Sequence, residues 1–246
     1  MAILILGGTT EANQLVNTLQ NSSHKIFLSL AGITSQPTLP PSCHPHIGGF
    51  GGVAGLCSFI TQHDITAIID ATHPFAQQIS TNATLSAQRM NIPLLRIERP
   101  QWFPQKGDNW LSIPTFMDVI QHLGKTSKNV FLTTGRKDLA AFCQAPQHHY
   151  VLRSIEPPTS NALPPQTTLL LSKPPFTLEN EQKLMRSYNI DFLVTKNAGS
   201  NATKAKLEAA KNLNIPVIMI ERPQLPEAQV VSTVEHARKW VSHLFS

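Results

Sequence analysis

The sequence predicts an α/β fold made of two similar halves, each a parallel sheet flanked by helices. The segment NIPLLRIERPQ at residues 91–101 returns as NIPVIMIERPQ at residues 214–224. The stretches that precede them also match, because residues 79–93 and 199–216 both run from Asn-Ala-Thr through a helical stretch into the repeated strand. Apolar strand-like runs alternate with helix-like runs, which is the order of βαβ units with parallel strands. A copied helix-to-strand unit indicates two related halves rather than a solenoid, which needs several shorter repeats.

The first half alternates short apolar runs with longer runs of helical character. Short runs rich in Leu, Ile and Val predict buried strands, and the longer runs predict helices. Ligands of parallel sheets bind at the carboxyl ends of the strands, so the loops there are the places to search for function. In chain order we expect a strand at 2–6, a helix at 11–20, a strand at 25–30, a helix at 53–62, a strand at 66–70, a helix at 76–90 and a strand at 93–97.

The alternation breaks over residues 100–129, which carry prolines, two tryptophans and the polar stretch GKTSKN. We therefore predict one domain at residues 1–125 and a second domain at residues 126–246. The last helix starts with a capping box from Ser232 to Glu235 and has one apolar face, so we expect it to pack on the second sheet. The second half is expected to hold strands at 129–132, 150–155, 168–172, 192–195 and 216–220, with helices after Lys137 and at 178–189, 204–212 and 232–244.

Composition narrows the class of protein. Hydrophobic residues make up 41% of the chain and charged residues 14%, against a usual charged share of about 25%, which predicts a soluble globular protein with an ample core. The formal charge is +5, but Lys and Arg are scattered, which argues against nucleic-acid binding. Three cysteines without paired spacing predict reduced thiols in the cytoplasm. The apolar run of MAILILGG is too short for a signal peptide or membrane span.

Two loops of the first half are candidates for binding a phosphorylated ligand. In GGTTEA (residues 7–12) the glycines permit a sharp turn, a threonine can cap the next helix, and the helix amino terminus offers N–H groups to an anion. A tight turn without ligand is the alternative reading. Dinucleotide folds often place an acid at the end of the second strand, but FLSLAGIT (residues 27–34) has none.

The run GGFGG (residues 48–52) stands just before a helix, and four glycines in five positions favour a close approach of the backbone to a ligand over a plain connector. DATHPF (residues 70–75) ends another strand. His73 there is either a proton donor or cofactor contact, or it braces the turn together with Asp70. Cys43, His44 and His46 lack the second cluster that a metal site needs.

Three strand-end loops of the second half carry cations. They are TTGRKD (133–138), SKPPF (172–176) and TKNAGS (195–200). One lysine in a loop is usually solvated, but cations in three successive loops indicate a rim that binds carboxylates or phosphates. The cationic residues of this rim are Arg136, Lys137, Lys173 and Lys196, and Thr133, Thr134, Asn197 and Ser200 accompany them.

Taken together, the loops resemble a known enzyme family. The set GGTTEA, SLAGIT, GGFGG, DATHPFA, LLRIERP, TTGRKDLAAF, PFTLENE and VTKNAGSNATKAKLEAA closely resembles the precorrin-6A reductase family of cobalamin biosynthesis, with its cobalt-precorrin-6A relatives. The resemblance runs from Ala2 to about Pro223. It implies two Rossmann-like lobes with an active site in the cleft between them, and an oxidoreductase that uses NADPH or NADH to reduce one macrocycle double bond, giving precorrin-6B or its cobalt form.

The resemblance also implies roles for residues. The substrate is a corrin precursor with carboxylate arms, which suits the cationic rim, and we expect a monomer or weak homo-oligomer without membrane or nucleic-acid partners. His73, Lys196 or water would supply the proton. The first lobe would bind the cofactor through Gly7, Gly8, Thr9, Glu11, Gly32, Thr34, Gly49, Phe50, Gly51 and Gly52, and the second would bind the substrate through Thr134, Arg136, Lys173, Lys196, Asn197 and Ser200.

The chain departs from the family pattern at several positions. Asn13 and Ile33 replace arginines, Lys173-Pro174-Pro175 stands for an Arg-Gly-Pro step, and Ser200 stands for a glycine. The loss of the arginine at Ile33 leaves the choice between NADPH and NADH open. Two other functions remain as alternatives at this stage: a two-lobed binding protein for an anionic small molecule, and a nucleotide-sugar transferase.

Overall fold

The structure is a computed structural model of the chain, and it describes residues 1–32, 39–41, 43–158 and 163–244. These residues form two compact units. Unit 1 holds Met1–Pro100 and Pro223–Ser246, and unit 2 holds Gln101–Arg222. Each unit has its own six-stranded sheet, in which every strand pairing is parallel. The predicted α/β class with two parallel sheets is therefore confirmed.

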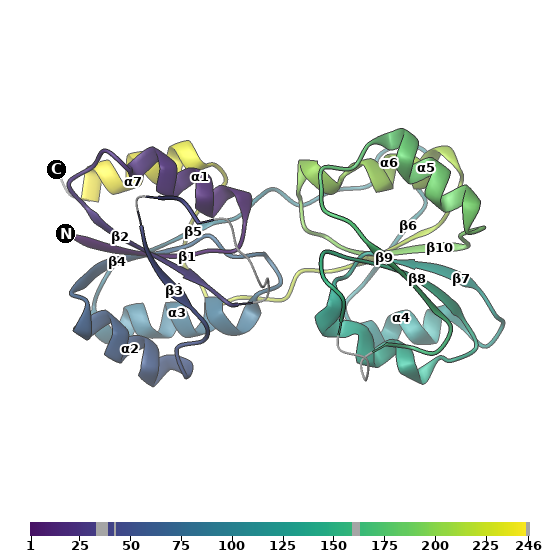
Figure 1. The fold of residues 1–246 in the computed structure, drawn as a ribbon, viewed down its shortest axis with the longest axis horizontal. Helices are drawn as coiled ribbons and strands as arrows, with labels where there is room; N and C mark the ends of the chain where they lie inside the picture. The colour runs from purple at the N-terminus through teal and green to yellow at the C-terminus, as the bar shows by residue number, and fades with distance from the viewer. Residues whose placement is uncertain (33–38, 42, 159–162, 245–246) are drawn as a thin grey trace. The chain divides into compact units, whose positions relative to one another are not determined.

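In unit 1 the sheet has the order β12-β5-β4-β1-β2-β3. Helices on both faces bury the apolar runs completely, as in β1, where all five residues are buried. Helices α1 (Thr10–Leu19) and α7 (Val234–Leu244) cover one face, and α2 (Gly52–Gln62) and α3 (Gln77–Met90) cover the other (Figure 1). The strands are β1 (Ala2–Leu6), β2 (Lys25–Leu30), β3 (His44–Ile47), β4 (Ile65–Asp70), β5 (Leu94–Ile97) and β12 (Gln229–Val231).

Unit 2 repeats this topology with the strand order β6-β11-β10-β7-β8-β9. Helices α5 (Leu178–Ser187) and α6 (Ala205–Asn212) cover one face of its sheet, and α4 (Phe116–Leu123) lies on the other (Figure 1), packed with the 3-10 helix η1 (Arg136–Gln144). A second 3-10 turn, η3 (Asn201–Thr203), precedes α6. The strands are β6 (Trp110–Ile113), β7 (Asn129–Leu132), β8 (His149–Ser154), β9 (Thr167–Leu171), β10 (Phe192–Lys196) and β11 (Val217–Ile220).

The repeated sequence segment marks the two places where the chain passes from one unit to the other. The first copy forms β5 and the second forms β11, as predicted. Each copy continues into Glu-Arg-Pro, and the units divide at Pro100/Gln101 and at Arg222/Pro223. After the first passage β6 pairs with β11, and after the second β12 pairs with β5. Each sheet thus receives one of its two edge strands from the segment of chain that follows a passage.

The domain boundary predicted at residues 125 and 126 is wrong. The sheet of unit 2 already includes Trp110–Ile113, and the chain after Arg222 belongs to unit 1. The physical reason is that the proline-rich, polar stretch at 100–129 hides a short edge strand. Such a strand needs only one neighbour, and its local sequence shows little of the apolar alternation used to find strands.

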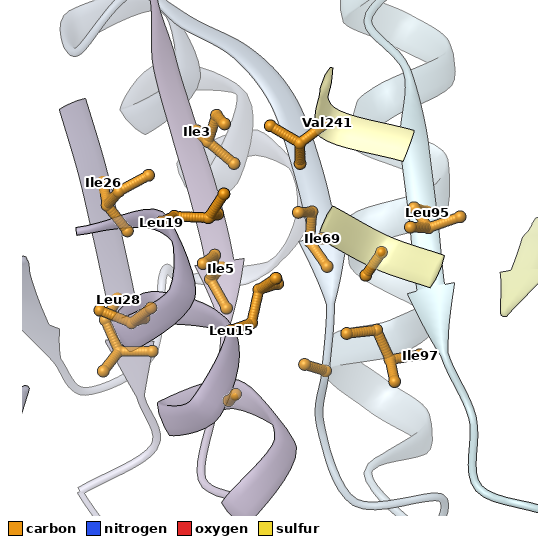
Figure 2. Close-up of a cluster of buried hydrophobic side chains, with 14 of the residues drawn as sticks. Ile3, Ile5, Leu15, Leu19, Ile26, Leu28, Ile69, Leu95, Ile97 and Val241 are labelled. Carbon is orange, nitrogen blue, oxygen red and sulfur yellow. The ribbon is translucent and has the colours of Figure 1, made fainter. Parts of the chain in front are cut away.

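The last helix also packs elsewhere than predicted. Ala237 and Val241 of α7 are buried in the core of unit 1, not on the second sheet. Figure 2 shows Val241 facing the strands that carry Ile69 and Leu95, in the same cluster as Leu15 and other residues of α1. The helix is capped by Thr233, whose Oγ1 accepts a hydrogen bond from His236 N at 3.2 Å, one residue later than predicted.

The described part of the chain contains neither a disulfide nor a helix suited to crossing a membrane. Cys43, Cys57 and Cys143 form no disulfide with one another. None of the described helices combines the length and the apolar character that crossing a bilayer requires.

Candidate functional site

The topology of each sheet points to a place where ligands bind. In unit 1, β1 has β2 on one side and β4 on the other, so the chain order reverses between β1 and β4. In unit 2 the same reversal falls between β7 and β10. Loops at the carboxyl ends of two such strands diverge and leave a crevice that open α/β sheets use for binding. The loops after these four strands contain Gly7 to Thr9, Asp70 to His73, Thr133 to Arg136, and Lys196 to Ser200.

The two glycines after β1 serve different purposes. Gly7 donates its N–H to Ser29 O at 2.8 Å, and a Cβ at this position would lie 2.7 Å from Leu28 Cδ1. Gly7 is therefore required by the close approach of β2. Gly8 has φ +98°, and a Cβ there would meet no atom within 4 Å. Gly8 combines a backbone conformation that favours glycine with open space, which is the arrangement expected beside a ligand.

Thr9 and Glu11 organise the start of α1. Thr9 Oγ1 accepts from Ala12 N at 3.2 Å as the helix cap and donates to Ala71 O at 2.7 Å, which joins the loops after β1 and β4. Glu11 pairs with Arg99 at 3.3 Å. The sequence reasoning did not single out Arg99, although it lies in the repeated Glu-Arg-Pro. Because Arg99 neutralises Glu11, the amino terminus of α1 keeps its attraction for an anion.

The end of β2 is described only in part. Gly32 follows the strand, and a Cβ there would lie 3.5 Å from Ile47 Cγ2. Thr34, the other residue predicted to bind the cofactor in this loop, and the neighbouring Ile33 lie outside the described residues.

The glycine-rich loop before α2 has an open outer side. At Gly48, Gly49, Gly51 and Gly52 an added Cβ would meet nothing within 4 Å. Gly51 caps α2 in the left-handed region, with φ +80°. The inner side is closed, because a Cβ at Gly55 would overlap the carbonyl oxygen of Phe50. The loop is thus pressed onto the first turn of α2 while its glycines line a surface without side chains.

The ring of Phe50 is partly buried and packs against other aromatic rings. It stacks on His46 with centroids 4.4 Å apart and planes 10° apart, and it meets Phe59 edge-on at 5.1 Å. Burial lowers the pKa of His46, and the nearby His63 lowers it further. A hydrogen bond to the backbone of Gly49 raises the pKa and offsets part of this effect. His46 therefore holds the loop as a neutral residue, by one ring stack and one hydrogen bond.

The two histidines near Cys43 pack against aromatic rings. His44 lies against Phe27 at 5.2 Å between ring centroids, and His46 lies against Phe50. In the part of the chain that the structure describes, no three His, Cys, Asp or Glu side chains are grouped so that they could hold a metal ion.

Asp70 and His73 behave differently at the end of β4. Asp70 is buried and accepts hydrogen bonds from Thr72 Oγ1 at 2.7 Å and from Arg96 Nε at 3.2 Å. Asp70 thus braces the turn, as one of the two sequence interpretations held. His73 is half-buried, and its Nδ1 accepts a hydrogen bond from Phe75 N at 3.2 Å. This bond fixes the imidazole orientation at the edge of the sheet.

In unit 2, the loops after β7 and β10 bring Thr134, Lys196 and Asp138 to the reversal point. Thr134 is 5% exposed, and its Oγ1 has no hydrogen-bond partner among the described residues. The ammonium of Lys196 forms an ion pair with Asp138 and lies 5.6 Å from the ring centroid of Phe116. Asp138 was missed by the sequence reasoning, although it closes the predicted loop TTGRKD.

The other predicted cations are spread more widely. Arg136 pairs with Glu156 at 3.7 Å and donates to Pro157 O at 3.3 Å. Lys173 is exposed after β9, which lies two strands away from β7, so the structure does not bring it to the same place as Lys196. The side chain of Lys137 lies outside the described part of the structure.

Asn197 and Ser200 have structural partners in the described loops. The Asn197 side chain accepts from Trp102 N at 2.8 Å and donates to Trp102 O at 3.0 Å, and its own carbonyl accepts from Arg222 Nε at 2.8 Å. Asn197 therefore ties both segments that pass between the units to the end of β10. The Ser200 carbonyl accepts from Thr203 N at 3.2 Å, and Ser200 caps η3.

Known proteins resemble this chain over nearly its whole length. The family described as precorrin-6x reductase CbiJ/CobK matches residues 2–242. The precorrin-6A reductase of Rhodococcus erythropolis is 44% identical, covering 98% of both chains. The cobalt-precorrin-6A reductase of Priestia megaterium is 29% identical, covering 95% of both. The solved structure of CobK precorrin-6A reductase is 39% identical and superposes with a TM-score of 0.93, covering 100% of this chain and 98% of that one.

Proposed function

The chain belongs to the precorrin-6x reductase family, and from this premise we propose how its residues reduce precorrin-6A in cobalamin biosynthesis. The enzyme is an oxidoreductase that saturates one double bond of the macrocycle to give precorrin-6B or its cobalt form. The observation that carries the proposal is the match to precorrin-6A reductases over 98% of the chain. We propose that the reductant is NADPH or NADH, and that unit 1 binds it.

The residues of unit 1 fit a dinucleotide. The open glycine surface at Gly49, Gly51 and Gly52 lets backbone approach a ligand closely, and the amino termini of α1 and α2 attract phosphates. Gly8, Thr9, Gly32 and the predicted Thr34 complete the expected contact surface. Three of the predicted residues already contact other groups of the protein, so they would support this surface and would not touch the ligand. They are Gly7, Glu11 and Phe50. A bound reduced nicotinamide supplies the hydride.

The residues of unit 2 would hold the macrocycle. The buried hydroxyl of Thr134 is a polar group that a substrate can satisfy. Arg136 faces Glu156 at 3.7 Å, which is longer than the roughly 2.7–2.9 Å of a strong charge-assisted hydrogen bond. A substrate carboxylate would compete with Glu156 for this guanidinium. Lys173 would reach an outlying carboxylate arm, and Asn197 and Ser200 would shape the loop. His73, Lys196 and water are the candidate proton donors.

The deciding assay is the loss of reduced-dinucleotide absorbance, with NADPH and NADH each combined with metal-free and cobalt-bearing precursor. We expect oxidation with at least one combination of dinucleotide and precursor. The preferred combination then identifies the cofactor and the metal state of the substrate. If no pair is consumed, or if nicotinamide fluorescence reports no binding, the proposal fails and an anion-binding protein becomes the better description.

Loosening the glycine loop should weaken dinucleotide binding. His46→Asn removes the ring stack on Phe50, and an aromatic pair contributes about 0.5–1.5 kcal/mol, so we expect the Kd for the dinucleotide to rise roughly 2- to 12-fold with little change in kcat. The measurement is a fluorescence titration. His44→Asn is the matched control on the same strand, because His44 faces Phe27 and not the loop. An equal rise in both variants would contradict the assignment.

A further inference from the structure

We infer that Asp138 is a positioning residue that holds Lys196 as the proton donor of the reduction, not as an anchor for a substrate carboxylate. The inference rests on the proposed function and deepens it, because it selects one donor among His73, Lys196 and water.

The contacts of Lys196 are those of a fixed side chain. It is the last residue of β10, and Asp138 lies in the first turn of η1, just after the neighbouring strand β7. The Lys196 side chain is 16% exposed and that of Asp138 is 29% exposed. Their ion pair spans the reversal point of the sheet, and Phe116 from α4 presents its ring to the same ammonium. Carboxylate and ring thus approach Lys196 from two different elements.

The presence of an acid here argues against an anchoring role. A carboxylate at a rim that receives a carboxylate-rich substrate repels the substrate. An ammonium already paired with Asp138 is also a poorer partner for a second carboxylate. Arg136, the neighbouring cation, is paired more loosely with Glu156 at 3.7 Å, and Lys173 is exposed. Those two side chains suit anchoring, whereas the held ammonium of Lys196 suits proton transfer, which depends on orientation.

The chemistry balances with this assignment. One carbon of the substrate double bond gains a hydride with its electron pair, and the π electrons move onto the conjugated macrocycle. A Lys196 N–H bond then breaks, its proton joins the macrocycle to complete the saturated bond, and the electron pair stays on the nitrogen. The neutral amine regains a proton from solvent.

Replacing Lys196 by arginine separates the two roles. Arginine keeps the charge but does not release its proton near neutral pH, so an anchor would retain both KM and kcat. For a donor we expect kcat to fall about 100-fold or more, with substrate KM and dinucleotide Kd within about 3-fold of wild type. A Lys196→Arg variant with near-normal kcat would overturn the inference.

Asp138→Asn tests the positioning role. We expect a kcat about 10- to 100-fold lower, a larger solvent deuterium isotope effect, and partial rescue by Asp138→Glu. In the ligand-free protein, the NMR signal of the Lys196 ammonium should broaden, because loss of the ion pair speeds the exchange of its protons with water. An unchanged NMR signal would refute the positioning role even if no substrate were turned over.

The matched control is Asp191→Asn, which makes the same charge change at the opposite end of β10. Asp191 accepts a hydrogen bond from Asn129 N at 2.8 Å, and an asparagine oxygen can still accept it. This variant should keep the wild-type kcat and the wild-type NMR signal of the Lys196 ammonium. If the wild-type protein itself oxidises no dinucleotide, the proposed function fails; if it does and Asp138→Asn behaves like Asp191→Asn, only the inference fails.

Discussion

Replacing Glu181 by glutamine is expected to lower the free energy of unfolding by about 3–5 kcal/mol, the usual effect of breaking a buried ion pair by removing one partner. Glu181 on α5 pairs with Arg153 on β8, and both side chains are almost fully buried. Lys206 on α6 is buried beside them, so the glutamine variant leaves two cations without their carboxylate. Urea-induced unfolding of unit 2 is the measurement.

Glu179→Gln is the control for this variant, because it makes the same change on the same helix at an exposed position. It should alter stability by no more than about 0.5 kcal/mol. A loss below about 1 kcal/mol for Glu181→Gln would mean that the cluster is solvated and not a buried ion pair. A variant with Arg153, Glu181 and Lys206 all replaced by apolar residues should recover much of the loss, since well-packed apolar groups often replace such clusters without cost.

Replacing Lys206 by methionine is expected to stabilise the protein most at neutral pH and below. Burial, together with the nearby charge of Arg153, lowers the pKa of Lys206 from 10.5 to about 7, although Glu181 acts in the opposite direction. Between about pH 7 and pH 10.5 the unfolded chain therefore binds more protons at this site, and wild-type stability rises with pH. Below pH 7 the full penalty remains, about 5 kcal/mol at 1.4 kcal/mol per pKa unit.

The test compares the free energy of unfolding of wild type and Lys206→Met from pH 6 to pH 9. The difference should be largest at the acidic end and should shrink by up to about 1.4 kcal/mol per pH unit above pH 7. Lys204→Met, two residues earlier at an exposed position, should show no such slope. A difference independent of pH would show that Lys206 stays charged in the folded protein.

Two buried arginines show which part of an ion pair can be inferred from the sequence and which part requires the structure. Arg96 and Arg153 each lie in an apolar strand run, PLLRI and YVLRSI, and each is at most 7% exposed. An arginine inside a buried strand needs a carboxylate partner. The partners are Asp70, at the end of the adjacent strand β4, and Glu181, on a helix. An arginine inside an apolar strand run therefore implies that a carboxylate partner exists, but the neighbouring sequence does not identify which carboxylate it is.

In the candidate site, too, local sequence patterns located the loops but did not identify the distant partners of their residues. Glycine and helix-cap patterns located the loops after β1 and before α2, and cations that follow predicted strands located the loop after β7, because these signals are local. The hydrogen bonds of Asn197 with Trp102 and the ion pair of Lys196 with Asp138 join segments that are far apart in the chain. Asn197 and Trp102 are 95 positions apart, and Lys196 and Asp138 are 58 apart. The partners of Asn197 make it a residue that supports the loops, and the partner of Lys196 fixes the direction of its side chain.

By itself the sequence determined the fold class, the repeated helix-to-strand unit and the family, because apolar periodicity and loop motifs are properties of neighbouring residues. Only the tertiary structure decided that the chain passes between units at each Glu-Arg-Pro, that β6 and β12 join the sheets as edge strands, and that α7 packs on unit 1. The physical reason is that an apolar stripe shows that a face must be buried but not which sheet buries it. That choice depends on the shape and free edges of both sheets, which exist only once the chain has folded.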